Sequence, residues 1–118
     1  MSYTNFAYDD LRVEETSDAL EISVSLKNTG ERAGTEVAQL YIQDVAASLV
    51  RPVKELKDYQ RLTLAPGEER EVRFTLPKAA MGFYDNDGKY RLESGLFRVF
   101  VGGSSRETLQ HELRITFA

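Results

Sequence analysis

An alternation of apolar and polar residues is the feature that most constrains what this chain can fold into. Residues 20–27 read Leu-Glu-Ile-Ser-Val-Ser-Leu-Lys, so every second side chain is apolar. Successive side chains of an extended strand point to opposite faces, and this pattern therefore places all four apolar side chains on one face. Further extended stretches occur at residues 36–42, 59–64, 71–76, 97–101 and 109–117. The pattern predicts an all-β fold whose strands each bury one face.

Turn-forming residues separate these stretches. Clusters of Gly, Pro, Asn, Asp and Ser occur at residues 28–30, 65–68, 85–88 and 102–105. Pro66 followed by Gly67 suits a tight turn, because Pro fixes φ at the second position and Gly accepts a positive φ at the third. Seven or eight short antiparallel strands with such spacing are typical of a β-sandwich. We expect an immunoglobulin-like topology and, because the chain has neither Cys nor Trp, a fibronectin type III-like variant of it.

The phase of the alternation changes near the start of the chain. Phe6 and Tyr8 are even-numbered, whereas Leu11 and Val13 are odd-numbered. A shift of one residue turns side chains to the opposite face of a strand. We therefore predict a β-bulge or a change of sheet at residues 9–10, where one extra residue restores the phase.

Two later stretches are irregular. Pro52 disfavours a helical conformation at the preceding residue, so residues 44–54 are interpreted as a loop that crosses from one sheet to the other. Residues 78–82 have room for one short helical turn, and residues 83–84 and 89–92 flank a predicted hairpin tip.

Composition excludes several classes of function. The 118 residues form one expected domain, residues 1–118, with a net charge of −4, no Cys and a single His. Zinc sites built on Cys or paired His are excluded, and no cofactor or metal is expected. The acidic balance argues against a nucleic-acid partner, and no apolar run is long enough to cross a membrane. The first residues lack a charged-then-apolar leader, and the compartment stays open.

A set of short motifs is spread over essentially the whole chain. They are Phe6-x-Tyr8-x-x-Leu11, Lys27-Asn28-Thr29-Gly30-x-x-Ala33-Gly34-x-Glu36-Val37, Gln39-Leu40-Tyr41, Arg51-Pro52-Val53-Lys54-Glu55-Leu56-Lys57, Leu64-x-Pro66-Gly67-Glu68 and Gly95-x-Phe97-x-Val99-x-Val101-Gly102. In this order the motifs closely resemble the C-terminal fibronectin type III-like domain of glycoside hydrolase family 3, the β-glucosidases and β-xylosidases. One departure is Asp58, where glycine is expected before the aromatic residue.

The resemblance implies that the chemistry lies elsewhere. Family 3 enzymes are retaining glycosidases whose Asp nucleophile and Glu acid/base belong to a barrel and an α/β domain. No position of this chain matches those motifs, so no catalytic residue is assigned. We expect an accessory module, an excised C-terminal domain of a larger glycosidase, whose partners are the barrel and α/β domains of a parent that hydrolyses β-glycosides.

Two features invite a catalytic or metal-binding interpretation and are set aside. Asp85-Asn86-Asp87-Gly88 resembles the start of a calcium loop, but the Glu expected at loop position twelve is Leu96. Paired carboxylates at a hairpin tip lack the cleft that glycoside hydrolysis needs. His111 shares a strand face with apolar residues, and a place at the rim of the core is expected, because no nucleophile or carboxylate is spaced to work with it.

Two neighbouring strands predict a domain-docking surface. If Ala38, Leu40 and Ile42 face inward, then Val37, Gln39 and Tyr41 face outward. If Phe97, Val99 and Val101 face inward, then Leu96, Arg98 and Phe100 face outward. These stretches are interpreted as strands C and G of one sheet. The predicted docking residues are therefore Val37, Gln39, Tyr41, Leu96, Arg98 and Phe100, bordered by Arg51 and Lys54.

A different class of function stays open beside docking. Exposed aromatic rings stack on sugars in carbohydrate-binding modules, and a saccharide or a cell surface is the alternative partner. The absence of Trp weighs against it, and most of the rings are expected in the core or in an interface. The residues concerned are Tyr41, Tyr59, Phe83, Tyr84, Tyr90 and Phe100.

Overall fold

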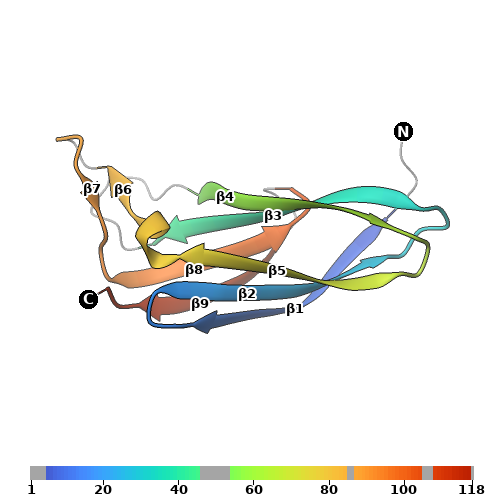
Figure 1. The fold of residues 1–118 in the computed structure, drawn as a ribbon, viewed down its shortest axis with the longest axis horizontal. Coiled ribbons are helices and arrows are strands. Elements are labelled where there is room, and N and C mark those ends of the chain that lie inside the picture. The colour runs from blue at the N-terminus through green and yellow to red at the C-terminus, as the bar shows by residue number, and fades with distance from the viewer. Residues whose placement is uncertain (1–4, 46–53, 85–86, 105–107, 118) are drawn as a thin grey trace.

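The computed structural model is a sandwich of two antiparallel sheets (Figure 1), and it describes residues 5–45, 54–84, 87–104 and 108–117. One sheet has the order β1-β2-β5 and the other β4-β3-β8-β9, while β6 and β7 pair as a short separate hairpin. This confirms the predicted all-β sandwich. The elements are β1 (Phe6–Glu15), β2 (Ala19–Asn28), β3 (Gly34–Asp44), β4 (Lys54–Leu64), β5 (Glu69–Pro77), η1 (Lys78–Met81), β6 (Phe83–Tyr84), β7 (Tyr90–Arg91), β8 (Gly95–Gly102) and β9 (Thr108–Ile115).

The core is formed by the apolar side of the alternating strands. Each of the central strands β2, β3 and β8 contributes side chains from every second position, and β5 adds three more. Close packing between two sheets about 10 Å apart excludes water from these side chains. The fully enclosed residues include Leu20, Ile22, Val24 and Leu26 of β2, Leu40 of β3, Val72 and Phe74 of β5, and Phe97, Val99 and Val101 of β8.

The predicted change of phase in β1 is a β-bulge. The register with β2 shifts between Asp9 and Arg12, and Asp10 adopts a positive φ of 57°. The extra residue lets Phe6, Tyr8, Leu11 and Val13 all pack against the core although their numbers differ in parity. This arrangement places the hydroxyl of Tyr8 beside β3, within hydrogen-bonding distance of Glu36.

Asn28 fixes the turns at one end of the sandwich. Its buried side chain donates to the carbonyls of Arg32 and Leu64, at 2.8 and 3.0 Å, and accepts from the amide of Gly30 at 2.8 Å. Gly67 has a φ of +78°, and the amide of Glu68 donates to the carbonyl of Ala65, as the Pro-Gly pair predicted. This turn carries the chain from β4 in one sheet to β5 in the other.

Two topological predictions were wrong. The loop after β3 does not cross between sheets, because β4 pairs antiparallel with β3 along nearly its whole length, from Gly34–Leu64 to Gln43–Lys54. The strand predicted at residues 59–64 therefore begins at Lys54. The strand at residues 95–102 was predicted as strand G, the last strand of its sheet. Strand β8 is not at the edge, because β9 pairs with it on the side away from β3. By its place in the sheet, β8 corresponds to strand F, directly beside strand C.

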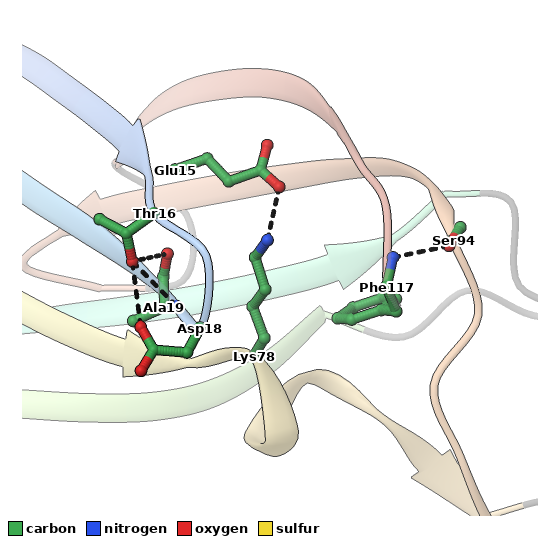
Figure 2. A network of polar contacts seen from close by, with 7 residues as sticks. All are labelled: Glu15, Thr16, Asp18, Ala19, Lys78, Ser94 and Phe117. Carbon is green, nitrogen blue, oxygen red and sulfur yellow. Dashed lines mark hydrogen bonds and ion pairs between the residues drawn. The ribbon is translucent and has the colours of Figure 1, made fainter.

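Polar contacts close each sheet separately at the opposite end of the sandwich (Figure 2). Nζ of Lys78 in η1 forms an ion pair with Oε2 of Glu15 at 2.7 Å, and the amide of Phe117 donates to Oγ of Ser94 at 2.8 Å. The Phe117 ring meets Phe97 edge to face, with ring centroids 6.0 Å apart. The short helical turn predicted at residues 78–82 is η1. Within the described ranges, no helix has the length and apolar character needed to span a membrane.

Candidate functional site: an aromatic face on the four-stranded sheet

The outer side of the four-stranded sheet carries a cluster of two rings and one ammonium. Tyr41 of β3 lies directly opposite Phe100 of β8, both on the side away from the core. Nζ of Lys54 lies 4.0 Å from the Phe100 ring centroid and 5.5 Å from that of Tyr41. Such contacts contribute about 0.5–1 kcal/mol at exposed sites. Phe100 is only 7% exposed, although its strand position faces outward.

A bulge in β4 adds two exposed apolar side chains to the same surface. The register between β3 and β4 shifts at Leu40/Tyr41, so that Tyr41 pairs with Leu56 and Gln39 pairs with Tyr59. Leu56 and Tyr59 differ in parity, and an unbroken strand would turn them to opposite faces. Their side chains are 51% and 63% exposed. We call the surface formed by Val37, Gln39, Tyr41, Lys54, Leu56, Tyr59, Leu96, Arg98 and Phe100 the aromatic face.

The polar members of the aromatic face hold its rings in place. The Tyr41 hydroxyl donates to Oε1 of Gln39, and the Gln39 amide donates to the carbonyl of Gly103 at 3.0 Å. Arg98 is paired with Glu112 of the edge strand at 2.8 Å. The structure thus brings together seven of the eight predicted docking residues on one side of one sheet, and Arg51 lies outside the described residues. Sequence reasoning missed Leu56 and had not placed Tyr59.

The outer side of the other sheet is of opposite character. It is a shallow concavity of about 740 Å³, floored by Ser23 and Ser25 of β2 and flanked by charged side chains of β1 and β5. Arg12 pairs with Asp10 at 3.2 Å, Arg73 pairs with Glu71, which raises the pKa of the Arg73 guanidinium, and further carboxylates line the rim. We call this surface the charged face. Its mixed charges are typical of a sheet surface that stays in water.

The catalytic and metal-binding alternatives gain no geometric support. Asp85 and Asn86 lie outside the described residues, while Asp87 is exposed in the turn at Gly88, which has a φ of +78°. His111 is exposed on the edge strand β9, opposite Val99. In the described part of the chain, no three His, Cys, Asp or Glu side chains gather as a metal site would require.

Three of the rings expected in the core or in an interface are exposed in this domain and so are not core residues. Tyr84 and Tyr90 on the β6–β7 hairpin are 68% and 45% exposed, and Tyr59 is exposed as well. The rings of Tyr84 and Tyr90 meet edge to face, at an interplanar angle of 63°. They form no flat platform of coplanar rings on which a sugar would stack. The side chain of Phe83 lies outside the described part of the structure.

A carboxylate lies in a second, smaller pocket at the side of the sandwich. Glu36 of β3 accepts a hydrogen bond of 3.0 Å from the Tyr8 hydroxyl of β1. Burial, and secondarily the negative charge of Glu36, raise the pKa of Tyr8 far above its usual range, so the hydroxyl keeps its proton. Sequence reasoning did not find this contact, because its partners are 28 positions apart and neither belongs to a recognisable spacing.

Comparison with known proteins agrees with this architecture. Residues 36–105 match the family model of the fibronectin type III-like domain. The chain is 44% identical over 117 residues to thermostable β-glucosidase B of Acetivibrio thermocellus, covering 95% of this chain and 16% of that protein. It is 40% identical to the periplasmic β-glucosidase of Salmonella typhimurium, over 93% of this chain and 15% of that protein. A putative β-xylosidase of Formosa agariphila is 41% identical, over 89% of this chain and 14% of that protein.

Solved structures give the same result. A β-glucosidase involved in saponin metabolism, from intestinal bacteria, superimposes with a TM-score of 0.92 at 34% identity, over 98% of this chain and 17% of that one. The β-glucosidase of Listeria innocua with laminaribiose superimposes with a TM-score of 0.87 at 40% identity, over 98% of this chain and 16% of that one. The chain spans only about a sixth of the length of these relatives. It belongs to the fibronectin type III-like domain family, in the form found in β-glucosidases and β-xylosidases of glycoside hydrolase family 3.

Proposed function

We propose that this chain is a non-catalytic accessory domain that stabilises or positions the catalytic domains of a family 3 β-glucosidase-type enzyme. In this proposal the catalytic domains supply the hydrolysis of O-glycosyl bonds in β-glycosides, and this domain supplies a packing surface. The relatives offer a partner of suitable size, because about five-sixths of their length lies outside the matched segment.

The observation that carries the proposal is the contrast between the two outer sheet faces. The charged face has the composition of a solvated surface, whereas the aromatic face exposes Leu56 and Tyr59 next to the Tyr41–Phe100 pair. Contiguous apolar surface rimmed by polar groups marks an interaction site more often than scattered hydrophobes do. Covering the exposed halves of Leu56 and Tyr59 would contribute about 1 kcal/mol each, roughly half of the value for full burial.

A chimeric enzyme tests this proposal. This chain would replace the matching segment of Acetivibrio thermocellus β-glucosidase B, and melting temperature and aryl β-glucoside hydrolysis would be measured. Tyr59→Ser and Leu56→Ser are expected to destabilise the chimera or lower its activity while leaving the isolated chain nearly unchanged, because both side chains are already exposed there. Phe100→Ser is unsuitable, since Phe100 is largely covered even in the isolated domain.

The matched control is Tyr84→Ser. Tyr84 is as exposed as Tyr59 but belongs to the separate β6–β7 hairpin and not to the four-stranded sheet. We expect the chimera with Tyr84→Ser to keep the melting temperature and the hydrolytic activity of the unaltered chimera. Equal losses for Tyr59→Ser and Tyr84→Ser would remove the docking role from the aromatic face, and no loss for Tyr59→Ser or Leu56→Ser would refute docking through it altogether.

A further inference from the structure

The pocket around Glu36 combines a carboxylate with apolar walls. It has a volume of about 300 Å³ and is lined by Phe6 and Tyr8 of β1, Glu36 of β3, Gly103, and Thr108 and Leu109 of β9. Phe6, Tyr8 and Leu109 are partly buried and pack against the core, so the walls of the pocket are held by the sandwich itself. The pocket lies where β1 of one sheet meets β3 and β9 of the other, and none of its lining residues belongs to the aromatic face.

Three contacts fix the Glu36 carboxylate inside the pocket. Oε2 accepts the Tyr8 hydroxyl at 3.0 Å, and Oε1 accepts the backbone amide of Val37 at 3.2 Å. Oε2 also lies against Gly103, where an added Cβ would approach it to 2.6 Å. All these contacts are to neutral groups, and each carboxylate oxygen keeps lone-pair capacity for another donor.

No cation of the described residues compensates this charge. The ion pairs among those residues involve Asp10, Glu15, Glu55, Glu68, Glu71 and Glu112, and none involves Glu36. A partly buried carboxylate that pairs with none of the described cations is a favourable partner for an incoming cation, because the lower local dielectric strengthens the attraction. The surrounding rings favour a cation that also stacks.

We propose that this pocket binds an arginine side chain presented by a partner polypeptide. A guanidinium has donors in a planar fork that matches the two oxygens of a carboxylate, and its flat face packs against aromatic rings such as Phe6 and Tyr8. The remaining aliphatic stem would contact Leu109. This site is separate from the aromatic face, and it stands whether or not that face docks on catalytic domains.

The test uses the 118-residue chain and a small probe. N-acetyl-L-arginine N-methylamide is titrated into the isotope-labelled chain, and amide chemical shifts are followed by NMR. Saturable shifts are expected at Gly103, Thr108 and Leu109, with a dissociation constant in the millimolar range that is typical of one side chain. The citrulline analogue has the same shape without the charge and is expected to bind at least tenfold more weakly.

Two variants locate the binding. Glu36→Gln keeps an acceptor for the Tyr8 hydroxyl but removes the charge, and it is expected to weaken arginine binding at least tenfold. Glu14→Gln removes an exposed carboxylate at a distance from the pocket and is expected to change nothing. Equal binding of arginine and citrulline, or unaltered binding by Glu36→Gln, would overturn the proposal. If Glu36→Gln fails to fold, the citrulline comparison on the unaltered chain still decides.

Discussion

Tyr41 and Phe100 lie directly opposite one another across β3 and β8, with the Lys54 ammonium over both rings. Lys54 lies on the edge strand β4, and its Nζ is 4.0 Å from the centroid of the Phe100 ring on β8. Long lysine stems often cover apolar surface in this way while the charge stays near water. In the isolated domain the Phe100 ring is largely shielded from water. Leu56 and Tyr59 are the large apolar side chains of the aromatic face that stay exposed.

Lys54→Ala should destabilise the isolated chain by about 1 kcal/mol, since it removes the cation–π contacts to Tyr41 and Phe100 together with the packing of the lysine stem. Lys54→Met keeps most of the stem and should recover part of that loss. Urea denaturation followed by circular dichroism measures both. Identical midpoints for the alanine variant and the unaltered chain would show that the contact does not contribute to stability.

Asn28→Ala should destabilise the chain by about 2–3 kcal/mol. The change leaves the buried carbonyl of Leu64 without its donor and removes the contacts to Arg32 and Gly30. Thr29→Ala is the matched control, because its hydroxyl makes one exposed hydrogen bond, to the carbonyl of Asn5. Thermal unfolding of both variants should separate them clearly, and similar losses would assign the effect to the turn as a whole.

Glu68 should stabilise the fold only where its carboxylate is ionised. A hydrogen bond from the amide of Ala65, and then the pairing with Arg70, lower the pKa of Glu68 in the folded chain. The stabilisation is therefore present above the unfolded pKa of about 4.3 and is lost as the pH falls through the lower folded value. Melting temperatures of Glu68→Gln should lie below those of the unaltered chain at pH 7 and converge with them near pH 3.

Glu69→Gln serves as the comparison for this pH series, because it alters the neighbouring exposed carboxylate at the start of β5. Its melting temperature should follow that of the unaltered chain at both pH values. If the melting temperature of Glu68→Gln stays below that of the unaltered chain at pH 3, the effect comes from packing in the turn and not from the charge.

The isolated chain should not hydrolyse aryl β-glucosides or β-xylosides. The Asp87 carboxylate is exposed in a turn and the His111 imidazole is exposed on an edge strand, whereas retaining hydrolysis requires two acids about 5 Å apart beside a cleft. Release of nitrophenol at the rate of a buffer blank is the expected result. Turnover that is lost in Asp87→Asn would contradict the assignment of the chain as non-catalytic.

Local periodicity predicted most of the fold. The strands around β2, β3, β5, β8 and β9 follow from alternation, and the β1 bulge follows from the change in parity at residues 9–10. The sheet to which β4 belongs was not predictable in the same way. Its first half has no clean alternation, because the bulge opposite Leu40/Tyr41 interrupts the phase.

The candidate site shows the same limit. The outward positions of Tyr41, Arg98 and Phe100 follow from strand parity, but the contact of the Lys54 ammonium with the Phe100 ring depends on the path of a long side chain. The contact of Tyr8 with Glu36 joins strands of different sheets and depends on how the sheets are stacked, which no local pattern encodes.

Accessibility of Leu56 tests the central claim most directly. The chain has no Cys, so Leu56→Cys introduces a single thiol on the aromatic face, and Thr75→Cys introduces one on the outer side of β5. Labelling rates of each thiol would be compared by mass spectrometry in the isolated chain and in the Acetivibrio thermocellus chimera. Docking through the aromatic face predicts that the thiol at position 56 reacts at least tenfold more slowly in the chimera, while the thiol at position 75 reacts equally in both. Equal rates at position 56 in the two proteins would contradict the account.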